Sequence, residues 1–340
     1  MAEASASSCM RTIDCPLSEI TGDFDLSAMK RYNMFFLDKY VVCSIPAQLN
    51  FCMKVGLLPT TRNCSYCKRE LKLSVENRPD HATPVVYRCC NRGCRKCSKY
   101  VSIRDGTVFE GSHLSVAVIL RLIILYINNI TSYEQLRMEC VDERDVELSN
   151  ETVNDWLTYF REIQLEALIR NSQGKIGGPN CTVEIDESKF GKRKYNRGRV
   201  VEGQWVVGGI CRETGEIFVA LCPDNKRDSA TLISIIEQHV DERSAVITDC
   251  WKAYNQLEQQ NWLHLTVNHS MHFVDPTTGA HTQNIENTWW QMKRNLPSTH
   301  GGNLLLHFAQ YLWRRKFQAC DIHTCTTFLR HITELYPGRN

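Results

Sequence analysis

The sequence contains no apolar run of the ~18 residues that a membrane-spanning helix needs. The best candidate, Val116 to Ile127, is too short and includes Arg121. The first ten residues, MAEASASSCM, lack the basic start and apolar core of a secretory signal, so we expect none. The chain has no internal repeat. With 43% hydrophobic and 23% charged residues, its composition also excludes a mainly disordered chain, a collagen and a coiled coil. We therefore expect a folded protein that does not associate with a membrane.

Excess charge is also missing, since 40 basic and 38 acidic residues leave a net charge of +2 over 340 residues. Cysteine, by contrast, is abundant. The 17 cysteines cannot all pair within the chain, and six of them lie between Cys64 and Cys97. In the reducing cytosol or nucleus, clustered cysteines more often bind a metal than form disulfides. Eleven basic and only four acidic residues lie between Arg62 and Asp105, so this block is the basic part of the chain.

The spacing of the clustered cysteines predicts a zinc ribbon with four thiolate ligands. Cys64 and Cys67 form the first pair, and we prefer Cys89 and Cys94 for the second. Cys94 with Cys97 is the alternative second pair, and Cys90 is the weakest candidate. Four thiolates would close a structural Zn²⁺ site with no position open for catalysis. The alternative without metal is a group of reduced, buried cysteines. The basic surroundings favour contact with phosphates.

Hydrophobic spacing divides the chain into five parts. We expect an N-terminal helical segment (1–60), the zinc ribbon (61–110), a helical segment (111–173), an α/β domain (180–320) and a C-terminal tail (321–340). The N-terminal helices are expected at 26–41 and 47–55. The helices at 115–128, 132–138 and 150–169 fit either a helix-turn-helix that binds DNA or a plain three-helix packing module.

After a glycine-rich linker (174–179), the pattern changes to alternating strands and helices, which predicts an α/β domain with a mixed sheet. We expect strands at 182–185, 204–211, 217–222, 245–248 and 265–267. We expect helices at 229–240, 252–259, 284–296 and 304–317. The fold class is therefore α+β multidomain.

Three acidic residues lie where α/β folds place active sites. Asp186 ends the first strand of the domain, Asp249 follows a buried strand, and Glu286 begins a helix. Three convergent carboxylates suit two divalent ions about 3.5–4 Å apart, which promote attack on a phosphodiester. Each acid alone is more simply a solvated surface group. Glu184 and Glu187 flank Asp186, so position alone does not choose among these three.

These segments resemble the DDE transposase domain of the Merlin superfamily of DNA transposons and its bacterial insertion-sequence relatives. The matching segments are VEIDESKFGKRK (183–194), WVVGGI (205–210), ITDCWKAY (247–254), VNHSMHFVD (267–275) and HTQNIENTWWQMK (281–293). Upstream, RCCNRGCRK (88–96) and GTVFEGS (106–112) resemble the zinc ribbon that precedes this domain, and GLLP (56–59) fits the segment before the ribbon.

The resemblance implies an RNase H-like fold, with Asp186, Asp249 and Glu286 as a DDE triad that binds two Mg²⁺ or Mn²⁺ ions. It implies a cut-and-paste transposase that binds terminal inverted repeats, hydrolyses DNA at each end and joins the ends to target DNA. Bringing two ends together requires a dimer or a larger synaptic assembly. A eukaryotic host, which the N-terminal extension and the cysteine content favour, would place the protein in the nucleus, and a bacterial host in the cytoplasm.

Several residues near the triad are candidates for DNA contact. Six cations lie between Lys189 and Arg199 with no acidic residue among them: Lys189, Lys192, Arg193, Lys194, Arg197 and Arg199. This segment could follow a DNA backbone, act as a nuclear import signal or form a solvated hairpin. His269 and His281 are candidates for contact with the reacting phosphate or for structural roles. Lys293, seven residues after Glu286, shares its helix face. Trp289 and Trp290 are expected in the core.

Two other functions remain open from the sequence. A domesticated DNA-binding protein would bind the repeats without cutting them. A metal-dependent nuclease of the same fold would cut DNA without joining it.

Overall fold

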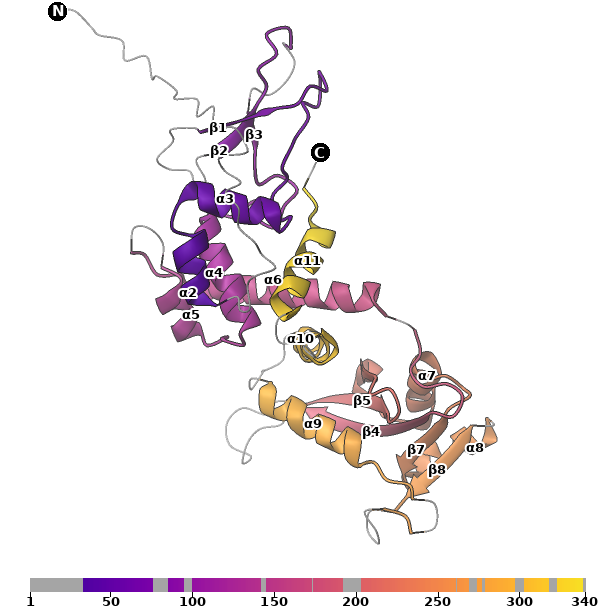
Figure 1. Cartoon of the computed structure of the whole chain (residues 1–340). Coiled ribbons are helices and arrows are strands. Elements are labelled where there is room, and N and C mark those ends of the chain that lie inside the picture. Colours follow the sequence, from indigo (N-terminus) through magenta and orange to yellow (C-terminus); the bar gives the residue numbers. More distant parts are fainter. Residues whose placement is uncertain are drawn as a thin grey trace, which may run out of the picture. The chain divides into compact units, whose positions relative to one another are not determined.

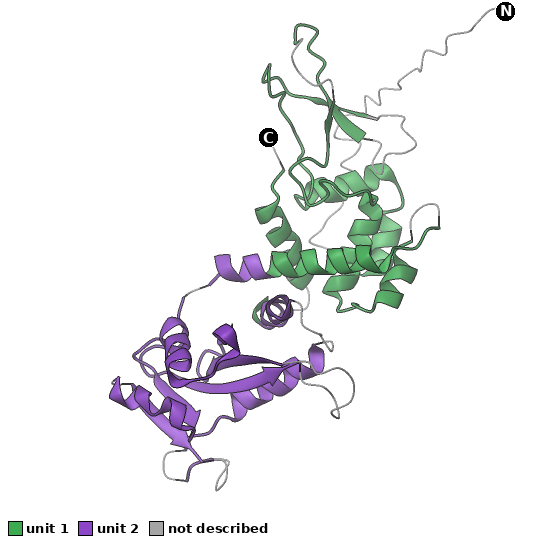
Figure 2. Cartoon of the chain, turned by 180° about the vertical axis from the view of Figure 1, so that it is seen from behind, with its two compact units in different colours: residues 1–164, 316–340 green, residues 165–315 purple. Residues whose placement is uncertain are grey.

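The computed structural model describes residues 33–75, 85–94, 100–141, 145–172, 174–191, 203–260, 262–268, 274–276, 279–296, 303–317 and 323–338. The chain divides into two compact units (Figure 2). Residues 1–164 and 316–340 form the first, and residues 165–315 form the second. Within the described ranges, no helix combines the length and the apolar composition that crossing a bilayer requires.

The cysteine-rich part of the first unit contains a small antiparallel sheet (Figure 1). Its strands are β1 (Lys72–Val75), β2 (Val85–Arg88) and β3 (Tyr100–Ser102), in the order β1-β2-β3. A tight turn precedes β1, in which the Cys64 amide donates to the Arg69 carbonyl at 2.8 Å. The buried Arg62 side chain joins this turn to the sheet, because its Nη1 donates to the Ser102 carbonyl at 2.9 Å.

Helices make up the rest of the first unit. They are α2 (Met34–Phe36), a π-helical turn (Leu37–Val41), α3 (Ile45–Lys54), α4 (Val116–Ile127), α5 (Tyr133–Glu139), most of α6 (Asn150–Arg170) and α11 (His323–Leu335). Helix α4 is apolar on nearly all sides, and ten of its 12 residues are buried. A helix that is hydrophobic all round lies in a core. Helices α2, α5 and α11 accordingly contact it.

The region treated above as a C-terminal tail contains a packed helix. In α11, Phe328, Leu329 and Ile332 are at most 3% exposed. The Phe328 ring lies 5.8 Å from the Tyr126 ring of α4 and 5.9 Å from the Phe160 ring of α6. The apolar residues recur at helical spacing, and they are buried only because residues far away in the sequence cover them.

The second unit is built on a five-stranded mixed sheet, as the alternating pattern predicted. Its strands are β4 (Thr182–Phe190), β5 (Gln204–Cys211), β6 (Ile217–Leu221), β7 (Ala245–Asp249) and β8 (Leu263–Val267), in the order β6-β5-β4-β7-β8. Strand β4 is antiparallel to β5 and parallel to β7. The helices are α7 (Ser229–His239), α8 (Gln256–Gln259), α9 (Gln283–Asn295) and α10 (Leu304–Phe317), with short 3₁₀ turns at Pro223–Asn225 and Lys252–Tyr254.

Each face of this sheet has its own apolar core, because successive side chains of a strand point to opposite faces. On one face, Val183 and Ile185 of β4 belong to a cluster with Leu232 and Ile236 of α7. On the other, Phe190 of β4 belongs to a cluster with α9 and α10. Strand β4 therefore carries Glu184 and Asp186 on the α9 face and Glu187 on the α7 face.

Three local expectations differ from the structure. Strand β4 runs to Phe190 rather than ending at Ile185, because all nine residues but Thr182 pair with β5. The helix expected at 252–259 divides at Asn255 into a 3₁₀ turn and α8. Trp290, expected in the core, is 59% exposed, whereas Trp289 is buried.

Candidate active site

Asp186 and Asp249 lie on neighbouring parallel strands. The register pairs Thr182 with Ala245 and Glu184 with Ile247. Extended by two residues, it places Asp186 level with Asp249, with both side chains on the same face. Ladder pairing between β4 and β7 ends before this level. Both carboxylates therefore lie just past the point where β4 and β7 stop pairing, at the carboxyl end of β7. The carboxyl ends of parallel strands are the usual site of chemistry in an α/β sheet.

Asp186 is held by helix α9. Its Oδ2 accepts a hydrogen bond from Nε1 of the buried Trp289 at 3.1 Å. Burial, together with the charges of Asp249 and Glu286, raises the pKa of Asp186 to about 6, against hydrogen bonds from the Glu187 backbone and Trp289. The three acids selected from the sequence are thus close enough to influence one another electrostatically.

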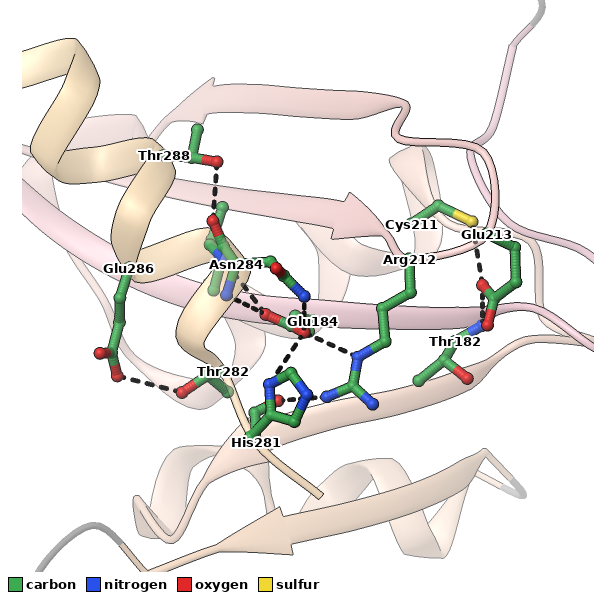
Figure 3. Close-up of polar contacts among 11 residues, drawn as sticks. Thr182, Glu184, Cys211, Arg212, Glu213, His281, Thr282, Asn284, Glu286 and Thr288 are labelled. Carbon is green, nitrogen blue, oxygen red and sulfur yellow. Dashed lines mark hydrogen bonds and ion pairs between the residues drawn. The ribbon is translucent and has the colours of Figure 1, made fainter. Parts of the chain in front are cut away.

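The other two carboxylates are held by local hydrogen bonds. Asp249 Oδ1 accepts from the Trp251 amide at 2.9 Å, a turn that fixes the side chain at the end of β7. Glu286 is exposed in the first turn of α9, and its Oε1 accepts from the Thr282 hydroxyl at 3.1 Å (Figure 3). In the described ranges, two groups of residues each bring three or more possible metal-ligand atoms within 4.8 Å of one another. The three carboxylates do not form such a group.

A buried acid that the sequence did not single out determines where α9 begins. Glu184 is fully buried, and its Oε2 accepts from the backbone amides of Asn284 at 2.9 Å and Ile285 at 3.1 Å. Its Oε1 accepts from Asn284 Nδ2 at 2.7 Å and from Arg212 Nε at 2.7 Å. Figure 3 shows these groups converging on Glu184 between β4 and the start of α9. Because Asp186 follows Glu184 on β4 and Glu286 follows Asn284 on α9, this contact sets the relative position of two of the three acids.

His281 belongs to the same network. Its Nδ1 lies 3.4 Å from Glu184 Oε1, and its carbonyl accepts from Arg212 Nη2 at 2.7 Å. The imidazole is three-quarters buried. These contacts fit the structural role for His281 given above, and its contact with DNA stays a prediction.

Glu187 lies on the opposite face of β4 from Asp186. Burial, together with the nearby charges of Asp186 and Asp249, raises the pKa of Glu187 to about 7, against the hydrogen bond from the Tyr254 hydroxyl. Arg227 also lowers the pKa of Glu187. The Arg227 guanidinium carbon lies 3.9 Å from the Trp205 ring centroid and 4.6 Å from that of Trp251. An exposed cation is thus stacked between two indoles beside the ends of β4 and β7.

The other residues predicted to contact DNA are only partly described. Lys189 has its Nζ 5.5 Å from the Trp205 ring, and Lys293 has its Nζ 5.4 Å from the Phe190 ring. Both lie near the triad, on β4 and α9 respectively. The remaining predicted contacts, Lys192, Arg193, Lys194, Arg197, Arg199 and His269, lie outside the described residues.

Four cysteine sulfurs come together beside the small sheet of the first unit. Those of Cys64, Cys67, Cys89 and Cys94, the preferred set, all lie within 4.8 Å of one another. The Cys64–Cys94 and Cys67–Cys89 sulfur distances are 3.9 and 3.8 Å. Hydrogen bonds, foremost that from the Cys67 amide, lower the pKa of Cys64 to about 6. Cys90 is exposed and contacts the Arg88 carbonyl instead, and Cys97 lies outside the described residues.

Residues 176–319 match the family model described as ISXO2-like transposase domain. An uncharacterized transposase-like protein of Haemophilus influenzae is 32% identical over 123 residues, which cover 35% of this chain and 94% of that protein. The chain belongs to the ISXO2-like transposase family. The matched range contains Asp186, Asp249 and Glu286.

Two solved structures are also similar to this chain. The catalytic core domain of HTLV-2 integrase, solved with magnesium, is 15% identical and covers 40% of this chain and 85% of its own. A chain of the simian T-cell lymphotropic virus intasome, solved with a PP2A regulatory subunit, is 13% identical. The match covers 48% of this chain and 54% of that chain. Both comparisons have a TM-score of 0.22, too low to decide the fold or the chemistry.

Proposed function

We propose that this member of the ISXO2-like transposase family is a cut-and-paste transposase with an RNase H-like catalytic domain and an Asp186–Asp249–Glu286 triad. The supporting observation is that Asp186 and Asp249 are level on adjacent parallel strands, with Glu286 on a helix attached to one of those strands through Glu184. The sequence motifs given above support a relationship to the DDE transposases of the Merlin superfamily.

The three carboxylates suit hard divalent cations such as Mg²⁺ or Mn²⁺, which prefer oxygen ligands. The raised pKa of Asp186 reflects its burial first, and then the repulsion from the charges of Asp249 and Glu286. A cation bound between Asp186 and Asp249 would offset the repulsion between their charges. Two bound ions would supply an activated oxygen nucleophile and stabilise the leaving oxygen.

The chain's own residues then orient these carboxylates. Trp289 and the Glu187 backbone hold the Asp186 carboxylate through hydrogen bonds. The Trp251 amide does the same for Asp249. Thr282 holds one Glu286 oxygen, while Glu184 anchors the helix that carries it. Ligands fixed by such contacts need little rearrangement when a cation binds.

The four-cysteine group suits a structural Zn²⁺ ion, because four thiolates at this spacing fill a tetrahedral coordination shell. The basic residues of the same block would contact the DNA ends. Lys189, Arg227 and Lys293 would contact the phosphate backbone near the triad. Synapsis of two ends would require at least two copies of the chain. Nuclear localisation stays a prediction from the sequence.

A strand-transfer assay tests this function. It would use the full chain, Mg²⁺ or Mn²⁺, and DNA that carries the terminal repeats flanking the gene. Metal-dependent cleavage and joining are expected, with a loss of at least 10³-fold in Asp249→Asn and wild-type rates in Glu237→Gln, which alters an exposed acid on α7. Binding without cleavage in either metal would instead indicate a domesticated DNA-binding protein, and cleavage without joining would indicate a nuclease.

A further inference from the structure

A second group of possible metal ligands lies at the other end of β4. Cys181 directly precedes β4, Cys211 ends β5, and Glu213 lies in the turn that leads to β6. Asp186 is five residues along from Cys181, or about 16 Å in an extended strand. The group is therefore separate from the three carboxylates, and it shares no residue with the four cysteines of the first unit.

The spacing of these side chains fits one ion. The sulfurs of Cys181 and Cys211 and a carboxylate oxygen of Glu213 all lie within 4.8 Å of one another. Cys211 Sγ is 3.4 Å from Glu213 Oε2. Around a tetrahedral Zn²⁺ with bonds of about 2.0–2.3 Å, neighbouring ligand atoms lie roughly 3.6–3.8 Å apart. The three atoms could reach that geometry through small side-chain movements.

The backbone holds the ligands in place. Cys211 is the register partner of Val183, and the Arg212 amide donates to the Thr182 carbonyl at 2.9 Å. The Thr182 amide donates to Glu213 Oε2 at 2.8 Å (Figure 3). Such an amide contact orients a carboxylate in the way that outer-shell hydrogen bonds orient metal ligands. This contact engages Oε2 of Glu213, and the Thr182 side chain and the Glu213 backbone also contact the carboxylate.

Charge and exposure also suit a cation. The neighbouring Arg212 does not neutralise Glu213, because its guanidinium is engaged by Glu184 and by the His281 carbonyl. Cys211 is buried, Cys181 is half-buried and Glu213 is exposed. One side of the group therefore faces solvent, from which a water molecule can complete four coordination. Two sulfurs with one carboxylate favour a thiophilic ion over Mg²⁺.

We propose that Cys181, Cys211 and Glu213 form a second zinc-class site, which binds one thiophilic divalent cation with water as the fourth ligand. The bound ion would join the start of β4 to the β5–β6 hairpin. It would thereby stabilise the strand that carries Asp186 without entering the chemistry. The site is independent of the proposed transposase function.

Zinc stoichiometry of the full chain tests the site. Reduced protein would be loaded with Zn²⁺, freed of excess ion by gel filtration and analysed by inductively coupled plasma mass spectrometry. The double variant Cys181→Ser/Cys211→Ser is expected to hold one Zn²⁺ fewer than wild type. Cys43→Ser, which alters an exposed cysteine outside both groups, should match wild type.

A milder variant covers the case in which the double variant does not fold. Glu213→Gln keeps the size of an exposed side chain but removes a carboxylate ligand. Competition with a chromophoric chelator would measure the zinc affinity of each site. Glu213→Gln should lower the affinity of the weaker site, assigned to Cys181, Cys211 and Glu213, at least tenfold. The affinity of the tighter four-cysteine site should not change. Loading with Co²⁺ provides a spectroscopic check. The weaker site has two thiolates instead of four, so its sulfur-to-metal charge-transfer absorption per ion should be lower than that of a four-thiolate site.

Two results would overturn the proposal. One is equal zinc content in wild type and in a folded double variant. The other is a Cys181–Cys211 disulfide in peptide mass spectra of the freshly purified chain, with no zinc lost in the double variant.

Discussion

The side-chain amide of Asn284 donates to Glu184 Oε1 at 2.7 Å, across 100 residues of sequence. Two backbone amides of the first turn of α9 donate to the other oxygen of the same carboxylate. The first amides of a helix have no partner within the helix. Glu184 therefore caps α9 from another element and fixes that helix against the strand that carries Asp186.

Removing this cap should destabilise the second unit. Glu184→Ala leaves Arg212 and the α9 amides without their buried partner, a kind of change that typically costs about 3–5 kcal/mol. With roughly 2–4 °C lost per kcal/mol in a unit of this size, we expect differential scanning fluorimetry to show a fall of at least 6 °C.

The matched control is Glu166→Ala, which breaks an exposed i,i+4 pair with Arg170. Such pairs contribute well under 1 kcal/mol, so the midpoint should move by 2 °C or less. Equal midpoints for Glu184→Ala and wild type would mean that α9 is held mainly by its apolar contacts.

Asp186 should make the folded protein less stable as pH rises. Its folded pKa, about 6, lies above the ordinary value, so the folded state binds more protons than the unfolded state between about pH 4 and 6. Stability from this group is complete at lower pH and falls through that window. In the absence of divalent cations, Asp186→Asn should exceed wild type in stability by about 3 kcal/mol at pH 7 and lose this advantage near pH 4.

Asp241 provides a control of opposite sign. Hydrogen bonds from Arg243 hold the pKa of the Asp241 carboxyl well below its usual range. Asp241→Asn should therefore lower stability at neutral pH and gain relative to wild type only in acid. Thermal midpoints across pH 3–8 measure both variants. A gain for Asp186→Asn that is the same at pH 4 and pH 7 would contradict the assignment.

Arg227 should contribute to DNA affinity through both its charge and its position between Trp205 and Trp251. Arg227→Gln is expected to weaken binding to duplex ends several-fold and to reduce the salt slope of binding by about one unit. Arg227→Lys should restore the slope but only part of the affinity, because an ammonium group stacks less well on indole.

Fluorescence anisotropy at several salt concentrations measures these changes. Lys226→Gln is the neighbouring control, since Lys226 lies 3.8 Å from Asp224 and is partly neutralised. An effect of Lys226→Gln as large as that of Arg227→Gln would point to general surface charge rather than the stacked cation.

The four-cysteine group should hold the small sheet together. Cys67→Ser removes one of four ligands, so it should release the zinc of this site and abolish the well-dispersed β1–β3 amide signals that a folded ribbon gives. Cys90→Ser should preserve both, because Cys90 lies outside the group. Zinc analysis and ¹H–¹⁵N correlation spectra provide the measurements. A folded β1–β3 sheet in zinc-free Cys67→Ser would show that the ribbon does not need the metal.

The sequence alone located the elements whose signals are local. Strand β5 and helix α10 have the predicted bounds, because each shows a clear period and ends at a turn or a helix-breaking signal. The four cysteines were selected from spacing alone, since two short pairs can each face one ion. The ordered acidic motifs were enough to identify the transposase family before any fold was known.

Only the tertiary structure distinguished the acids from one another. Glu184, Asp186 and Glu187 lie within four residues of one strand. The strand period of two puts Glu187 on the opposite face from the other two acids, but it does not predict which face holds the active site. Glu184 is buried because Arg212 and α9 reach it, Asp186 meets Trp289, and Glu187 lies against Tyr254 on the other face. The partners come from 28 to 103 residues away. Local propensity contains no information about such contacts, whereas packing and the cost of burying an unpaired charge decide them.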